Sequence, residues 1–153
     1  CLVHAAHQFR VQKEGEEYIL AGYPWFKSRA RDLFIALPGL TLSIGENEAF
    51  ETYMRTAEKA LRNLINNEPI SVDIHEMEQP DTVLWAIWCI QQYGKYVGRQ
   101  KCYEKYGALL KEIMEYIILD LEWDNVYFPP EKRFVNQILQ IWINCLEERL
   151  IAT

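Results

Sequence analysis

The sequence lacks the features that mark membrane and nucleic-acid proteins. Its 153 residues contain no run of about 18 apolar residues, the length a membrane-spanning helix needs. The net charge of −6 argues against binding a phosphate backbone, and the short basic patch from Lys27 to Arg31 is too small to reverse that. No signal peptide is visible, and because Cys1 comes first we expect the natural N-terminus to lie upstream. We therefore predict no membrane and no nucleic-acid partner.

Metal, cofactor and nucleophile motifs are also missing. The four cysteines, at positions 1, 89, 102 and 145, form no C-x-x-C pair. His4 and His7 lie three residues apart, but no third ligand follows them at metal spacing. There is no P-loop, no G-x-G-x-x-G and no G-x-S-x-G. We expect no metal and no cofactor, and a reducing, cytoplasmic setting.

The composition is that of one soluble globular domain, and it is rich in aromatic residues. Half of the residues are apolar, a quarter are charged, and the chain has five Trp and nine Tyr. Large rings usually fill a hydrophobic core. Some of them could instead line a sugar cleft, where flat rings stack on the apolar faces of pyranoses. Composition favours the core interpretation.

The hydrophobic pattern predicts a short β-hairpin followed by five helices. Two short runs around a Gly-containing turn, residues 9–11 and 18–21, predict the hairpin. Helical spacing predicts helices at about 31–45, 47–67, 81–98, 100–119 and 135–150. We expect Pro38 to kink the first of these or delay its start, Gly45 to stop it, and Asn47 to cap the next. The expected fold is a single all-α domain, 1–153, of antiparallel helix pairs.

Asp32 is the first candidate for chemistry. It follows a loop that carries three aromatic residues, Tyr23, Trp25 and Phe26. As a carboxylate near a helix start, it is explained by the helix dipole and the free backbone N–H groups. Alternatively, aromatic and water-poor walls keep it protonated, so that it acts as a general acid on a departing oxygen. The residues alone favour the first explanation.

Asp81 and two arginines are further candidates. Asp81 precedes an apolar helix that contains Trp85, so it is explained as an N-cap, or as a carboxylate that holds sugar hydroxyls beside a stacking ring. The sequence pattern alone favours the cap, and the two roles can coexist. Arg29 and Arg31 carry planar forks of donors suited to carboxylates or hydroxyls. For Arg29 we favour a salt bridge, and for Arg31 both interpretations stay open.

Two segments resemble the amylo-α-1,6-glucosidase domain of glycogen debranching enzymes. The first is Ala-Gly-Tyr-Pro-Trp-Phe at residues 21–26, then Arg31-Asp32, then Ile-Ala-Leu-Pro-Gly-Leu-Thr-Leu at residues 35–42. The second is Gln-Pro-Asp-Thr-Val-Leu-Trp at residues 79–85, which is similar to the family's D-A-P-L-W segment. The resemblance covers about residues 1–118.

The resemblance implies a fold, a reaction and roles for residues. The family's fold is an (α/α)6 toroid, of which this chain supplies about half. Its members hydrolyse α-1,6-linked glucose at branch points of glycogen with inversion, which needs one carboxyl as acid and one to activate water. By position, Asp32 would be the general acid. The residues that would shape the glucose subsite are Tyr23, Trp25, Phe26, Arg31, Asp81 and Trp85.

The chain also departs from the family's pattern. Arg29-Ala30 stands where many members have Trp-Gly, and the later segment that supplies the base carboxylate has no counterpart. We therefore expect the N-terminal portion of the domain, with little activity alone. It would form a homo-oligomer or pack against the missing half of the domain. The alternative functions are a noncatalytic carbohydrate-binding domain and a helical scaffold.

Overall fold

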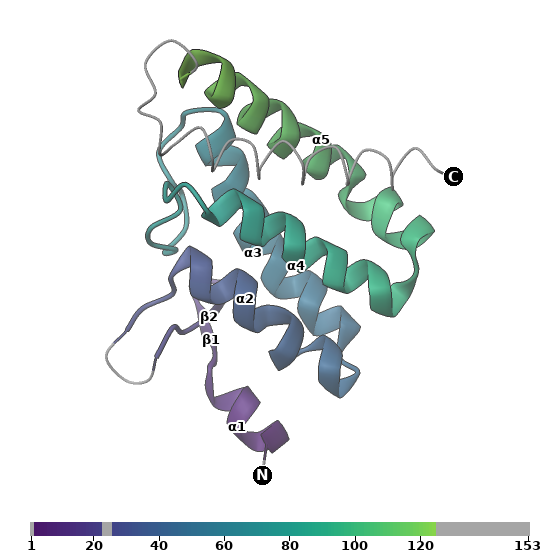
Figure 1. The fold of residues 1–153 in the computed structure, drawn as a ribbon. Helices are drawn as coiled ribbons and strands as arrows, with labels where there is room; N and C mark the ends of the chain where they lie inside the picture. The colour runs from purple at the N-terminus through teal and green to yellow at the C-terminus, as the bar shows by residue number, and fades with distance from the viewer. Residues whose placement is uncertain (1, 23–25, 125–153) are drawn as a thin grey trace. The chain divides into compact units, whose positions relative to one another are not determined.

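The computed structural model describes residues 2–22 and 26–124, which are mostly helical with one N-terminal hairpin (Figure 1). The elements in chain order are α1 (Leu2–Gln8), β1 (Arg10–Lys13), β2 (Glu16–Ile19), α2 (Ala30–Leu40), the 3-10 helix η1 (Leu42–Ile44), α3 (Asn47–Ile65), α4 (Thr82–Val97) and α5 (Arg99–Asp124). Residues 1–110 form one compact unit, and a second unit comprises residues 111–153. The expected helix at 135–150 lies outside the described residues.

The predicted β-hairpin is confirmed, and its turn explains its register. Strands β1 and β2 pair antiparallel, with Arg10 opposite Ile19 and Val11 opposite Tyr18. Glu14 and Gly15 connect them, both with positive φ (55° and 83°), as a two-residue turn matched to the strand twist requires. Tyr18 and Ile19 are buried, so the second strand attaches the hairpin to the helical core.

Helix α2 begins where the sequence predicts and tolerates its proline. It starts at Ala30, so Pro38 does not delay it. Pro38 lies within the last turn, so its missing N–H affects the hydrogen bonding of the helix only near its end. The helix ends at Leu40, before Gly45. Gly45 instead terminates η1, with φ 82°. Glu46 precedes α3, which begins at Asn47 itself, so the expected Asn47 cap is displaced by one residue.

Aromatic side chains join α3, α4 and the first turns of α5 in the core. Phe50 of α3 stacks on Tyr93 of α4, with ring centroids 4.9 Å apart. Tyr93 meets Tyr106 of α5 edge to face at 5.4 Å. A Cβ at Gly94 would lie 3.3 Å from the sulfur of Cys102, so glycine permits the close approach of the two helices. The apolar helix predicted from Asp81 is accordingly buried on most sides.

The helices alternate in direction. The most extensive contacts of α2 are with α4, and Figure 1 shows the two running side by side. The side chains of Arg31, in the first turn of α2, and Asp81, just before α4, meet at 2.8 Å. The N-termini of both helices therefore lie at one end. Phe50 near the start of α3 stacks on Tyr93 near the end of α4, so α3 runs antiparallel to α4.

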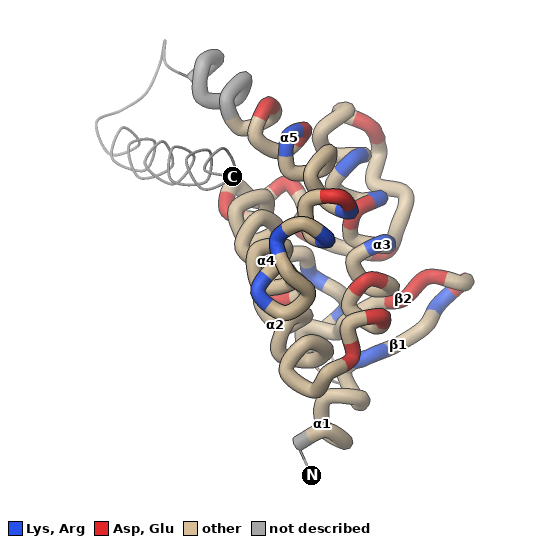
Figure 2. The backbone as a smooth tube through the Cα atoms, turned by 90° about the vertical axis from the view of Figure 1, so that its right-hand side faces the viewer, with Lys and Arg blue, Asp and Glu red and all other residues tan. Residues whose placement is uncertain are grey.

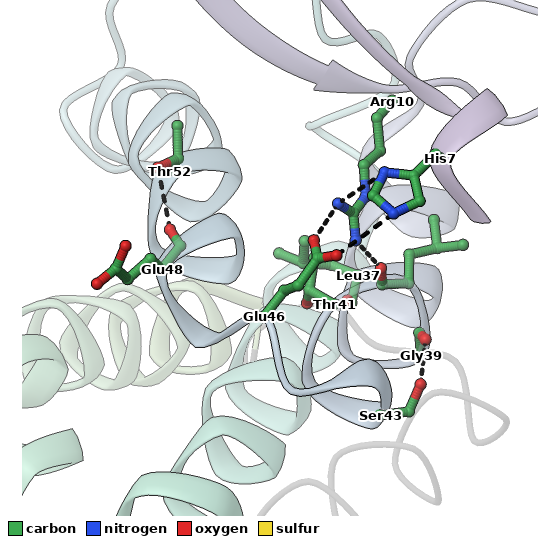
Figure 3. Close-up of polar contacts among 10 residues, drawn as sticks. His7, Arg10, Leu37, Gly39, Thr41, Ser43, Glu46, Glu48 and Thr52 are labelled. Atoms are coloured by element: carbon green, nitrogen blue, oxygen red, sulfur yellow. Dashed lines mark hydrogen bonds and ion pairs between the residues drawn. The ribbon is translucent and has the colours of Figure 1, made fainter. Parts of the chain in front are cut away.

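A polar cluster ties the N-terminal segment to the opposite end of α2 (Figure 3). The guanidinium of Arg10, only 9% exposed, donates to the carbonyl of Leu40 and to the carboxylate of Glu46. His7 lies on the other carboxylate oxygen, 3.3 Å away. A cation at the last carbonyls of a helix is favourable because the dipole is negative there. This cluster holds the N-terminal segment against the C-terminal end of α2.

Charges of both signs are spread over the described surface. Figure 2 shows acidic and basic residues interspersed along the hairpin and α3. No helix in residues 2–22 and 26–124 combines the length and the apolar character needed to cross a bilayer. The same residues contain no group of three or more His, Cys, Asp and Glu side chains placed to hold a metal ion.

Candidate functional site

The N-terminal ends of α2 and α4 bring three of the predicted site residues together. One carboxylate oxygen of Asp81 accepts a hydrogen bond from Nη2 of Arg31 at 2.8 Å. The other accepts from the indole Nε1 of Trp85 at 3.1 Å. Trp88 packs edge to face on Trp85, with centroids 5.7 Å apart, and so orients its ring. Residues fifty positions apart in the chain thus form one polar and aromatic cluster.

The favoured N-cap interpretation of Asp81 is wrong as far as its side chain is concerned. Asp81 occupies the cap position of α4, but its side chain makes no capping hydrogen bond. The reason is local: its φ of −90° and ψ of −9° are already helical, whereas a capping side chain needs extended backbone. Its carboxylate is directed instead to Arg31 and Trp85.

The ion pair of this cluster is exposed to solvent. Asp81 raises the pKa of Arg31, first through the hydrogen bond and then through its charge. The side chains of Arg31 and Asp81 are 54% and 36% exposed, so solvent reaches both partners of the pair. An exposed ion pair of this kind stabilises a fold little. It can present a fixed carboxylate and a planar fork of donors to the hydroxyl groups of a ligand.

Asp32, the proposed general acid, is exposed in the first turn of α2. A carboxylate there is favoured by the helix dipole, as the simpler interpretation holds. Its charge acts on the adjacent Arg31. The described residues do not enclose Asp32 in the apolar walls that a general acid needs. Its catalytic role therefore stays a prediction.

The aromatic loop before α2 is anchored at its base. The amide of Phe26 donates to the carbonyl of Gly22 at 2.8 Å, and that of Ala21 donates to Lys27 at 3.2 Å. The Phe26 ring, in a residue 53% exposed, packs so closely on Gly22 that a Cβ there would lie 2.8 Å from it. Tyr23 and Trp25, between these anchors, lie outside the described residues.

A second polar group at the start of α2 was not predicted as part of the site. Arg29 lies over the ring of Phe26, 5.3 Å from its centroid, and forms the expected ion pair, with Glu76 at 3.5 Å. The backbone of His75 accepts from Ala30 and donates to Ser28, both at 3.0 Å. Nothing in the local sequence marks Glu76, because its position depends on the pairing of two distant loops.

The profile of the family described as amylo-alpha-1,6-glucosidase matches residues 4–143, most of the chain. The chain belongs to this family. The match continues beyond residue 118, where the recognised resemblance ended. No curated protein and no solved structure matches the chain significantly.

Proposed function

We propose that the cluster at the N-terminal ends of α2 and α4 binds a glucose unit at an α-1,6 branch point of glycogen or a related α-glucan. The observation that carries the proposal is that the Asp81 carboxylate accepts hydrogen bonds from both Arg31 and the Trp85 indole. A carboxylate, a guanidinium and an indole together suit a pyranose, which offers hydroxyl groups at its rim and an apolar face. The family match supports an α-glucan as the ligand.

The proposed reaction is hydrolysis with inversion. Asp32 would protonate the glycosidic oxygen as the bond to the branch glucose breaks, and a second carboxyl would take a proton from the attacking water. Asp32 follows Arg31 directly, so its backbone is placed by the helix whose first turn carries the binding cluster. Because Asp32 is exposed, the bound sugar itself would have to exclude water from the carboxyl group of Asp32. We assign no residue to the second carboxyl.

We further propose that the described helices are successive hairpins of an (α/α)6 toroid. The shared direction of α2 and α4, with α3 antiparallel to α4, supports this arrangement because alternate helices of such a ring run the same way. It would place the starts of α2 and α4 at one end of the ring, where the candidate site lies.

The test is glucose release from a branched limit dextrin by the whole chain, measured beside binding of the same dextrin. The proposal expects binding that Asp81→Ala and Trp85→Ala weaken at least tenfold. It also expects that any glucose release is lost in Asp32→Asn while binding persists. Absence of binding, or binding indifferent to Asp81 and Trp85, would refute the proposed site.

A second candidate is a noncatalytic carbohydrate-binding domain. Two observations favour it: Asp32 is exposed, and both Asp81 and Glu76 are engaged with arginines. In this case the dextrin binds through Asp81 and Trp85, but no glucose is released at any protein concentration, and Asp32→Asn changes nothing. The helical scaffold predicts no sugar binding at all.

A further inference from the structure

We infer that Arg29 and Glu76 form a second sugar subsite together with Phe26, which the family resemblance had placed in the glucose subsite. This second subsite holds the glucan unit next to the one bound at Asp81. The inference rests on the proposed function and extends it by naming residues that contact the neighbouring unit. The two groups are adjacent: Arg29 and Arg31 share the start of α2, and the charge of Glu76 acts on Arg31.

The three side chains contact one another at the surface, because Arg29 contacts both Phe26 and Glu76. Phe26 belongs to the few large apolar residues that are more than half exposed, and the Arg29 guanidinium lies over its ring. Arg29 and Glu76 are 41% and 43% exposed, and at 3.5 Å their contact leaves most of the guanidinium donors available. A partly exposed ring beside a carboxylate and a fork of donors has the chemistry that a pyranose requires.

The loop before α2 and the loop that carries Glu76 are held together by backbone hydrogen bonds before any ligand binds. Arg29 and His75 form a parallel bridge, and the hydrogen bonds of Ser28 and Ala30 to His75 close it on both sides. On the loop that follows α3, Ile74 and Met77 are buried, and they anchor the two exposed residues between them, His75 and Glu76. Preorganised groups bind with less loss of conformational entropy.

Glu76 has an unusual backbone conformation for a residue other than glycine, with a φ of 60°. Among the described residues other than glycine, positive φ also occurs at Glu14, in the hairpin turn, and at Asn67, just after α3. Asparagine tolerates this conformation, whereas glutamate adopts it with strain. Because Glu14 is strained in the same way, the strain alone assigns no role to Glu76. It adds to the ion pair of Glu76 with Arg29, which lies over the exposed ring of Phe26, and strained residues concentrate at ligand sites.

The test compares two sugars on the whole chain by NMR titration: glucose, which fills one subsite, and panose, in which a glucose is α-1,6-linked to maltose and which can therefore reach two. The variants are Arg29→Gln and Glu76→Gly, with Glu14→Gly as the matched control. Glu14→Gly also removes an exposed carboxylate at positive φ, but in the hairpin turn. Both glycine variants relieve strain and should melt no lower than the parent chain, so loss of folding does not confuse the result.

We expect Arg29→Gln and Glu76→Gly each to weaken panose binding about tenfold, the effect of one lost hydrogen bond to a charged group. Glucose binding should change less than twofold, and Glu14→Gly should change neither. If panose binding is unaffected while glucose still binds, the second subsite is refuted and the proposed function stands. Equal losses for both sugars would place Arg29 and Glu76 in the first subsite and refute the assignment. If the parent chain binds neither sugar, the proposed function fails and the inference with it.

Discussion

The carboxylate of Asp81 lies 2.8 Å from the guanidinium of Arg31, and this contact joins the N-terminal ends of two parallel helices, α2 and α4. Asp81 also accepts from the indole of Trp85 one turn further along α4. Because solvent reaches the pair, its contribution to folding is small, while its geometry is well suited to a polar ligand. The contact is therefore the natural starting point for experiments.

The substitution Asp81→Asn should separate binding from stability. An asparagine keeps a carbonyl oxygen for the Trp85 indole but loses the charge that holds Arg31. We expect a melting temperature within about 2 °C of the parent chain, as for loss of an exposed ion pair, and a clear loss of dextrin affinity. Differential scanning calorimetry and a dextrin titration on the same samples measure both. A large drop in melting temperature with intact binding would show that the pair is structural.

The substitution Gly22→Ala should disturb the aromatic loop without unfolding the protein. The new Cβ would lie 2.8 Å from a ring carbon of Phe26, so the ring must move, and the stack with Arg29 is lost. We expect weaker panose binding and shifted ring resonances of Phe26 in NMR spectra.

Gly39→Ala is the matched control for that experiment. Gly39 lies in the last turn of α2, and nothing is within 4 Å of its Cβ position. Alanine is more favourable than glycine in a helix, so this variant should gain stability, by at most about 1 kcal/mol, with unchanged sugar binding. A loss of stability in Gly39→Ala would show that the end of α2 is packed more tightly than described.

Phe50→Ala should be the costly core substitution. Phe50 is fully buried and stacks on Tyr93, so removing its ring leaves a cavity between α3 and α4. We expect a loss of about 3–5 kcal/mol in the free energy of unfolding by urea denaturation. Tyr103→Ala, at a residue 60% exposed, should change it by less than about 0.5 kcal/mol. Similar losses for both would contradict the described core.

Stability should fall in acid below about pH 4.5, and Glu46 should account for part of this. The hydrogen bond from Arg10 lowers the pKa of Glu46 from its usual 4.5. A carboxyl with a lowered pKa contributes stability that is present above the unfolded pKa and is lost as the pH falls through the folded one. Lys59 and Lys13 lower the pKa values of Glu16 and Asp73 in the same way.

Melting curves between pH 7 and pH 3 check this prediction. Glu46→Gln removes one titrating group, so it should lower the melting temperature at pH 7 and reduce its dependence on pH below 4.5. An unchanged pH dependence in this variant would exclude the Arg10–Glu46 pair as a source of the acid sensitivity.

Local signals in the sequence were enough to predict the hairpin and the helices α2 to α5, but they did not predict α1 or η1. The alternation around Gly15 predicted the hairpin, and the 3.6-residue spacing of apolar side chains predicted α2 to α5, because both patterns reflect which face of a segment is buried. The one-residue shift at Asn47 and the end of α2 before Gly45 show the limit of this approach, since helix ends depend on a few hydrogen bonds.

The sequence by itself thus determined the helical class of the protein, its hairpin, its family and the candidate residues Asp32, Arg31, Asp81 and Trp85. It could not decide that Asp81 pairs with Arg31 instead of capping α4, or that Glu76 lies against Arg29. These contacts join residues about fifty positions apart. Only the packing of α2 on α4, and of one loop on another, brings such side chains within reach, and no local pattern records that distance.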